Sequence, residues 1–134
     1  SNPSTKIILH VADAPSHNKD VNNWFGSVKD LAAKGVRIIN VASSGIDKLT
    51  EFLFRSECIQ TNGCYAHLTN HSGIGGSHID ATTDKEEVVE YLDDLLVRVI
   101  GGMYSGTYKE AVPFVNENAN QNENQSIEEP VYYK

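Results

Sequence analysis

Asp13 stands where an apolar run of the chain ends. The stretch KIILHVADAPSH, residues 6–17, is mostly apolar up to Ala12 and then gives the single acid. A carboxylate just after a buried strand is placed to hold a hard cation, directly or through water, because such cations prefer oxygen ligands. The structural alternative is that Asp13 forms a turn with Pro15 or accepts hydrogen bonds from backbone N–H groups. Both interpretations stay open at this point.

Polar loops follow two further apolar runs, SSGID at 43–47 and TNHSGIGGSHIDATT at 69–83. In sheets of parallel strands, ligands bind at the carboxyl ends of the strands, so these loops and the one after Ala12 should meet at one crevice. The candidate crevice residues are Asp13, Ser16, Ser43, Ser44, Asn70, His71 and Ser72.

The third loop suggests two rival chemistries, phosphate binding and hydrolysis. Its glycines do not form the dinucleotide-binding pattern or the phosphate-binding G-K-[ST] pattern, which favours a role in unusual backbone angles. Cys64 or Ser72 with a nearby histidine would be needed for a hydrolase, but no G-x-S-x-G elbow is present. We expect a protein that is not an enzyme, with a hydrolase as the less favoured alternative.

The cysteines Cys58 and Cys64 are too few for a disulfide framework. We expect two small buried side chains without a bond, a local disulfide being the alternative. Their spacing is not that of a zinc site. His10 interrupts an apolar strand and is expected to be a hydrogen-bonded core or interface residue rather than a metal ligand.

Hydrophobic periodicity indicates the elements that position these residues. Continuous apolar runs predict buried strands over 6–12, 36–42 and 65–68. Apolar residues spaced three and four apart predict two helices. The first begins at Val21 and is stopped by Gly35, and the second runs from about Ile46 to before Asn62. The expected inner face of the second helix consists of Ile46, Leu49, Phe52, Leu53 and Ile59.

A third helix is expected to follow the polar loop. The sequence Thr83-Asp84-Lys85-Glu86 has the pattern of a capping box, in which the threonine and glutamate side chains satisfy free backbone N–H groups. Its expected inner face begins at Val88 and Val89, and Gly101-Gly102 are expected to end it.

Alternating strands and helices predict an α/β fold. We expect a Rossmann-like arrangement of three layers, with a parallel sheet and helices on both faces. The predicted domain covers residues 1–112, and residues 113–134 form a polar tail rich in Asn, Gln and Glu. A solvated tail is the favoured interpretation, and the alternative is that residues 130–133 dock on a surface or add to a sheet edge.

Charge and composition narrow the classes of partner. The 134 residues carry 18 acidic and 11 basic side chains and a net charge of −7, which would repel nucleic acid. No apolar stretch approaches the roughly 20 residues of a membrane span. The N-terminus lacks the pattern of a signal peptide. The compartment is left open, with an extracytoplasmic or cell-surface location favoured.

Several stretches together resemble the von Willebrand factor type A domain. VADAP at 11–15 is similar to the end of the family's fourth strand, and LAAKGVRIINVAS at 31–43 to the following helix and fifth strand. CIQTNGCY at 58–65 is similar to the entry to the sixth strand. HSGIGGSHIDATT at 71–83, followed by LDDLLVRVI at 92–100, resembles a bacterial subset of the family. The chain is thus identified as an incomplete domain of this type, from the fourth strand onward.

The resemblance implies a metal-ion-dependent adhesion site that binds a protein ligand through Mg²⁺ or another divalent cation. Asp13 would be the aspartate contributed by the fourth strand. The family's D-x-S-x-S motif does not occur in this sequence, so Asp13 is only part of such a site. A bound cation is expected in an intact parent domain rather than in this chain.

The family's strand order also implies that the strand at 6–12 has lost a neighbour. We expect an exposed apolar sheet edge there, covered by a second copy, by the chain's own tail or by an N-terminal portion of a longer parent. The expected alternative function is a metal-independent assembly domain that forms a homodimer through this strand.

Overall fold

The computed structural model describes residues 4–14, 20–43, 46–68, 88–113 and 132–133. The first three strands are β1 (Lys6–Ala12), β2 (Val36–Ala42) and β3 (Cys64–Leu68), and they are parallel. The sheet has the order β1-β2-β3-β5-β4. The expectation of an α/β fold with a parallel sheet is therefore confirmed for these three strands.

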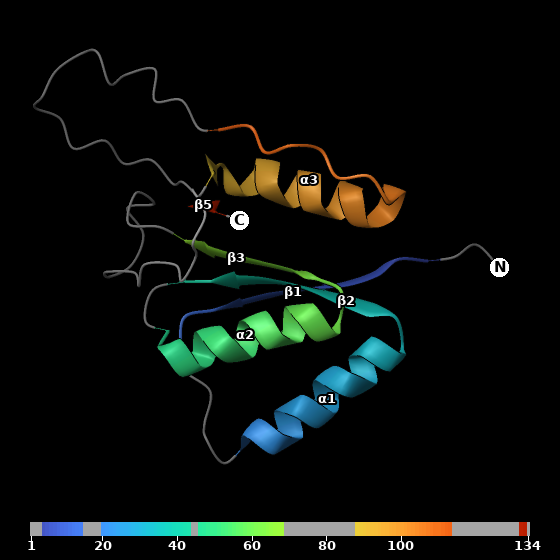
Figure 1. The fold of residues 1–134 in the computed structure, drawn as a ribbon, viewed down its shortest axis with the longest axis vertical. Helices are drawn as coiled ribbons and strands as arrows, with labels where there is room; N and C mark the ends of the chain where they lie inside the picture. Colours follow the sequence, from blue (N-terminus) through green and yellow to red (C-terminus); the bar gives the residue numbers. More distant parts are fainter. Residues whose placement is uncertain (1–3, 15–19, 44–45, 69–87, 114–131, 134) are drawn as a thin grey trace, which may run out of the picture.

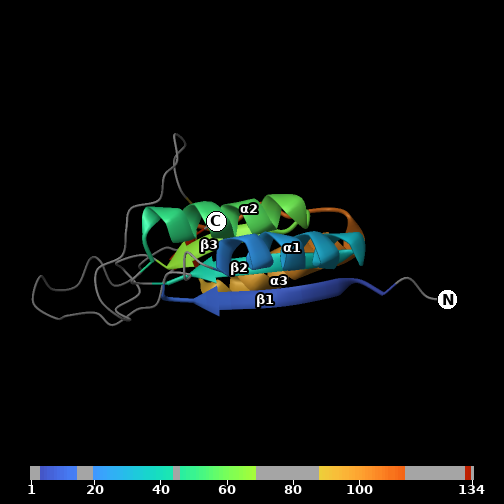
Figure 2. The same ribbon diagram turned by 90° about the horizontal axis from the view of Figure 1, so that it is seen from below.

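The helices form a layer on each face of the sheet. α1 (Val21–Ala33) and α2 (Lys48–Gln60) cover one face, and α3 (Leu92–Ser105) covers the other (Figure 1). Seen from below, β1 lies at the outer margin of the sheet (Figure 2). The predicted three layers are present in the described part of the chain. Within it, no helix is long and apolar enough to span a membrane.

The main core lies between the sheet and α3. Its buried residues come from β2, β3 and α3, and half-buried Ile7 and Leu96 pack against them. They are Ile39, Val41, Ala66, Leu68, Leu95, Val99 and Met103. A smaller cluster on the opposite face joins Ala42, Ile46 and Phe54, with Ala12 and Tyr65 packed on it. α3 is thus centred over β2 and β3, while β1 is at the side of this core.

The inner face of α2 differs from the expected one. Leu49, Phe52 and Ile59 are exposed, the last by 80%. The buried residues of the helix are Thr50, Glu51, Leu53, Phe54, Glu57 and Cys58. The prediction is confirmed for Ile46 and Leu53, which are buried, and was wrong for the other three positions, because polar side chains occupy much of the inner face.

The start of α3 also differs from the expected one. Val89–Glu90 form the short strand β4, and the helix begins only at Leu92. The expected capping box at 83–86 lies outside the described residues. The helix continues through Gly101 and Gly102 and ends at Gly106, whose φ of +78° suits a left-handed C-terminal cap. The buried side chain of Met103, in the last turn, holds the helix on the core past the two glycines.

Two glycines explain the turns that lead into β2 and β3, one by its backbone angle and one by a close contact. Gly35 has φ of +69°, as expected for the residue that stops α1. At Gly63, before β3, a Cβ atom would lie 1.9 Å from the carbonyl oxygen of Ile38, so only glycine fits there. These glycines fix the entries to β2 and β3.

Strand β5 (Tyr132–Tyr133) joins the sheet between β3 and β4, antiparallel to both. The alternative in which the end of the segment 113–134 adds to a sheet edge therefore applies to these two residues. Residues 114–131 lie outside the described part, and the predicted division into a domain and a tail stays a prediction.

Candidate functional site

Two of the expected crevice residues lie at the same end of the sheet. Ala12 and Ala42 are partners in the parallel register, and the N–H of Ser43 donates to the carbonyl oxygen of Ala12 at 2.9 Å. Asp13 and Ser43 therefore follow neighbouring strands at their carboxyl ends, as predicted from the sequence. Asp13 is exposed.

The other expected crevice residues, Ser16, Ser44, Asn70, His71 and Ser72, lie outside the described residues. Among the residues that are described, no group of three His, Cys, Asp or Glu side chains could hold a metal ion. Mg²⁺ in proteins is octahedral and takes about six oxygen ligands. A single exposed carboxylate beside a serine does not fit that requirement, so the described part of the crevice is not a complete cation site.

The edge of the sheet at β1 offers a different kind of site. Among the described strands, β1 pairs only with β2. The carbonyl of Ala12 points to the β2 side, because it accepts the bond from Ser43. Since successive residues of a strand direct their backbone groups to alternate sides, the N–H and C=O groups of Ile7, Leu9 and Val11 point away from β2. We call this side of β1 the open edge.

Side chains along β1 also alternate between the two faces of the sheet. Ile7 packs on the core beneath α3, so Leu9 and Val11 share the α3 face. These two side chains are 49% and 58% exposed. The interpretation of β1 as a strand covered on both faces is therefore wrong for the described residues, whereas the expectation of an exposed apolar edge is met.

On the other face, His10 belongs to a hydrogen-bonded cluster. The Nδ1–H of His10 donates to Oε1 of Glu57 at 2.7 Å, and Nδ2 of Asn40 donates to the same oxygen. Glu57 and Asn40 are buried, whereas the imidazole is partly exposed and lies 5.0 Å from the ring of Phe54. His10 is thus a hydrogen-bonded residue at the boundary of the core, as its place in an apolar strand predicted.

The electrostatics of this cluster favour the charged imidazole. The hydrogen bond to Glu57 raises the pKa of His10, and the negative charge of Glu57 adds to the effect, although burial opposes it. A buried carboxylate is stabilised by a charged partner. The cluster therefore places beside the open edge, on the face covered by α1 and α2, a histidine whose protonated form is favoured by Glu57.

The cysteines are both free, as expected. Cys58 is buried and donates to the carbonyl oxygen of Cys64 at 3.0 Å. Burial raises the pKa of the Cys58 thiol to about 12. Because the thiolate is the reactive form, Cys58 is unsuited to act as a nucleophile near neutral pH. Cys64 is half-buried rather than buried.

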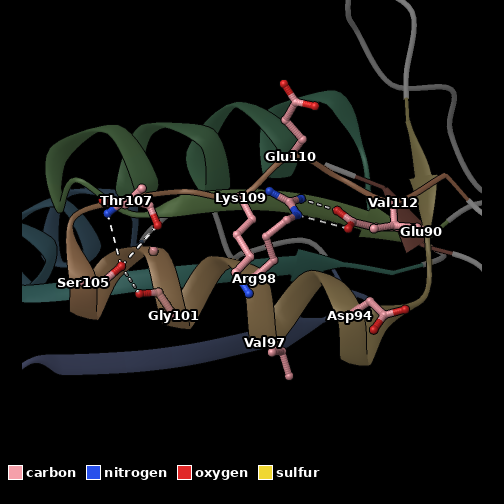
Figure 3. A pocket seen from close by; sticks show the side chains of 11 residues that line it. Glu90, Asp94, Val97, Arg98, Gly101, Ser105, Thr107, Lys109, Glu110 and Val112 are labelled. Carbon is pink, nitrogen blue, oxygen red and sulfur yellow. Dashed lines mark hydrogen bonds and ion pairs between the residues drawn. The ribbon is translucent and has the colours of Figure 1, made fainter.

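A groove of about 550 Å³ lies along α3 (Figure 3). One side is formed by α3 and β4, and the other by the segment 107–112, which runs back along the helix (Figure 1). Arg98 and Glu90 point toward one another at the groove (Figure 3), and both are buried. Nε of Arg98 donates to Oε2 of Glu90 at 3.1 Å, and Nη2 donates to Oε1.

The ion pair in this groove has a structural explanation. Each carboxylate oxygen of Glu90 accepts from the guanidinium, and these bonds raise the pKa of Arg98. The pair joins β4 to α3, since the two residues belong to these elements. The remaining charged lining is mixed, with Asp94, Lys109 and Glu110, and so does not select a ligand of either sign.

Sequence reasoning did not find either of these charged clusters. The available signal was a charged residue inside an apolar helical pattern: Arg98 lies within LLVRVI, and Glu57 lies three and four residues after the buried Phe54 and Leu53. A charge at such a position must have a buried partner. Spacing alone did not identify that partner.

The open edge is therefore the described surface with the clearest capacity to bind: unpaired backbone groups, exposed apolar side chains and an imidazole lie along one strand. A comparison of the chain with protein-family models, with curated proteins and with solved structures gives no match.

Proposed function

We propose that this chain is a non-enzymatic protein-binding module of the von Willebrand factor type A kind, which binds a β-strand of a partner protein along the open edge. The observation that carries the proposal is the exposure of Leu9 and Val11 on a seven-residue strand whose outward backbone groups are unpaired in the described structure. Addition of a strand would satisfy those groups and would cover one side of these side chains with its own.

The composition of β1 supports this proposal. Edge strands that remain in solvent are usually short or carry charges, proline or bulges that block pairing. In β1 the only ionisable side chains are Lys6 at its start and His10, which faces α2. The register with β2 runs without a bulge from Lys6 to Ala12. Such a strand is suited to pairing rather than protected against it.

The adhesion-type part of the proposal concerns the end of β1. A strand added parallel to β1 would end beside Asp13, so the loop that follows it would lie at the crevice. The resemblance implies that this loop carries the D-x-S-x-S motif in an intact parent domain. A divalent cation is therefore proposed for the parent, and strand addition to this chain is proposed to be independent of metal.

A second copy of the chain is the alternative partner. The unpaired groups of Ile7, Leu9 and Val11 would allow two β1 strands to pair antiparallel about a two-fold axis. The chain would then be a metal-independent assembly domain that dimerises through its sheet edge.

Peptide selection tests the proposed surface. A library of random eight-residue peptides would be selected against the wild-type chain, and the selected peptides measured against a Leu9→Lys variant. We expect at least a tenfold loss of affinity, because a charged side chain on an edge strand disfavours the addition of a further strand. An Ile59→Lys variant is the matched control, since Ile59 is an exposed apolar residue on α2.

The outcomes separate the proposals. Peptides that bind the Leu9→Lys and wild-type chains equally well use another surface, and this result would refute binding at the open edge. Sedimentation of the wild-type chain alone, with and without Mg²⁺, identifies the alternative: a dimer that Leu9→Lys dissociates and Mg²⁺ does not affect would favour the assembly domain.

A further inference from the structure

One flank of α2 carries two hollows that repeat along the helix. Each is bounded by four residues at positions i, i+3, i+4 and i+7. The first, of about 240 Å³, is lined by Lys48, Glu51, Phe52 and Arg55. The second, of about 440 Å³, is bounded by Arg55, Cys58, Ile59 and Asn62, with Gly63 and Tyr65 as a further wall. The hollows thus share Arg55 and follow one another seven residues apart.

This arrangement is that of a helix-packing surface. When two helices pack knobs-into-holes, each side chain that acts as a knob enters a hole formed by four residues of the other helix. Holes seven residues apart are about 10.5 Å apart along the axis, because a helix rises about 1.5 Å per residue. A second helix laid along α2 would therefore fill both hollows with side chains seven residues apart. We call the outermost residues that border the hollows, Lys48, Phe52, Arg55, Ile59 and Asn62, the α2 seam.

The described helices leave the α2 seam uncovered. Phe52 and Ile59 are 60% and 80% exposed and are the most exposed apolar side chains of α2. The second hollow faces Tyr65 of β3, whereas α1 lies toward β1 when the molecule is seen from below (Figure 2). α3 covers the opposite face of the sheet (Figure 1). In the described part of the chain, no helix therefore lies on this flank of α2.

Charge at the seam selects the helix that fits. The guanidinium of Arg55 lies 4.4 Å from the centre of the Tyr65 ring, and its Nε donates to Oε1 of Glu51 at 2.9 Å. Its Nη2 lies 2.8 Å from the same oxygen. Within the described residues Arg55 makes no further hydrogen bond, so some of its five N–H groups have no protein acceptor there. Lys48 is exposed and has no acidic partner among those residues. Although the whole chain carries a net charge of −7, the seam presents two cations that can face a carboxylate.

A second copy of the chain does not supply these carboxylates. Two α2 helices packed in parallel through their seams would set Lys48 and Arg55 each against its own copy, and like charges repel. Packed antiparallel, the helices would set Lys48 against Ile59 and Arg55 against Phe52. No acidic side chain faces the cations in either arrangement. The complementary helix must therefore come from another protein.

We infer that the α2 seam binds an amphipathic helix of another protein, which carries two apolar residues seven positions apart and acidic residues on the same face. The apolar side chains fill the two hollows and cover Phe52 and Ile59. An acidic side chain midway between them accepts from the N–H groups of Arg55, and another faces Lys48. This surface is separate from the open edge, so the inference goes beyond the proposed function and does not depend on strand addition.

Two designed peptides test the inference. Both have about twenty Ala-rich residues, a length at which an isolated helix forms in water, and both carry two leucines seven positions apart. In the acidic peptide, glutamate stands midway between the leucines and one helical turn outside each of them. In the basic peptide, lysine takes these places. Binding would be measured by fluorescence anisotropy, after circular dichroism has shown that the two peptides are equally helical.

We expect the wild-type chain to bind the acidic peptide at least tenfold more tightly than the basic one. The double variant Phe52→Ser/Ile59→Ser should bind the acidic peptide at least tenfold more weakly, because it removes an apolar wall from each hollow. Lys48→Glu should reduce the preference for the acidic peptide, because it reverses one of the two charges. Leu49→Ser is the matched control, since Leu49 is an exposed apolar residue of α2 that lines neither hollow. This control should bind both peptides as the wild type does, and urea unfolding checks that each variant is folded.

Three results would overturn the inference in distinguishable ways. Equal affinity of the wild-type chain for the two peptides, or binding of neither, would show that the seam does not recognise an acidic helix. Unchanged affinity in Phe52→Ser/Ile59→Ser, or an equal loss in Leu49→Ser, would place the acidic peptide on another surface. A wild-type dimer in sedimentation that Phe52→Ser/Ile59→Ser dissociates would assign the seam to a second copy. Leu9→Lys should bind the acidic peptide as the wild type does, so none of these results bears on the open edge.

Discussion

Replacing Arg98 by methionine should strongly destabilise the fold, because it leaves Glu90 without its charged partner. The Glu90 carboxylate is 1% exposed, and both of its oxygens accept from the guanidinium. Removing one partner of a buried ion pair costs about 3–5 kcal/mol. A domain of this size is stable by about 5–15 kcal/mol, so the loss would be a large part of the total.

Urea unfolding followed by circular dichroism measures this loss. With a slope of about 1–3 kcal/mol per M, Arg98→Met should lower the unfolding midpoint by at least about 1 M. The double variant Glu90→Leu/Arg98→Met is the control, since it removes both charges from the interior.

The double variant should recover most of the lost stability, because replacing a buried ion pair by apolar side chains is often neutral. A loss below about 1 kcal/mol in Arg98→Met would refute the view that the pair is buried and essential to the packing of β4 on α3. A double variant as unstable as the single one would show instead that the methionine disturbs the packing of the helix.

Two further predictions concern the His10 cluster and α3. Because Glu57 raises the pKa of His10, the contribution of the His10–Glu57 pair to the unfolding free energy is complete below pH 6.5 and is lost as the pH rises through the folded-state pKa of His10. His10→Gln should therefore flatten the pH dependence of the unfolding free energy, measured by urea unfolding at a series of pH values. An unchanged pH dependence would count against a stabilising His10–Glu57 pair. Gly101→Ala should raise the unfolding free energy by about 0.5–1 kcal/mol, since the position is helical and an added Cβ meets nothing within 4 Å. Gly102→Ala should lower the unfolding free energy, because its Cβ would lie 2.2 Å from the Tyr108 ring. Thermal unfolding of both variants tests these expectations, and equal shifts of the melting temperature would contradict the packing of Tyr108 on Gly102.

The parts of the fold that could be predicted are those in which one local signal decides the structure. β1, β2 and β3 are runs of apolar residues separated by amphipathic segments, and this order by itself predicts parallel strands with crossover helices. Gly35 could be identified as a helix stop because the end of a helix favours a left-handed residue. Asp13 and Ser43 could be placed at one end of the sheet because parallel strands end together.

The remaining parts depend on contacts between segments far apart in the sequence. The inner face of α2 includes Glu57, and this is favourable only because His10 and Asn40 reach it from β1 and β2. β4 interrupts the predicted start of α3 because its backbone pairs with β5. The residues that contact Glu57 and β4 lie far away in the sequence, so the spacing of apolar residues around α2 and α3 does not reveal them. Much of the inner face of α2 and the start of α3 were therefore assigned incorrectly.

The place of β5 in the sheet has a consequence for the order of folding. Among the described strands, β4 reaches the rest of the sheet only through β5, and β5 follows every other described element in the chain. Ribosomal synthesis therefore delivers β1, β2 and β3, which are joined by local crossovers, before the residues that close the far side. Pairing between distant segments requires closure of a long loop, which is slow. We expect a nascent chain in which the parallel core is already protected from hydrogen exchange while β4 still awaits its neighbour.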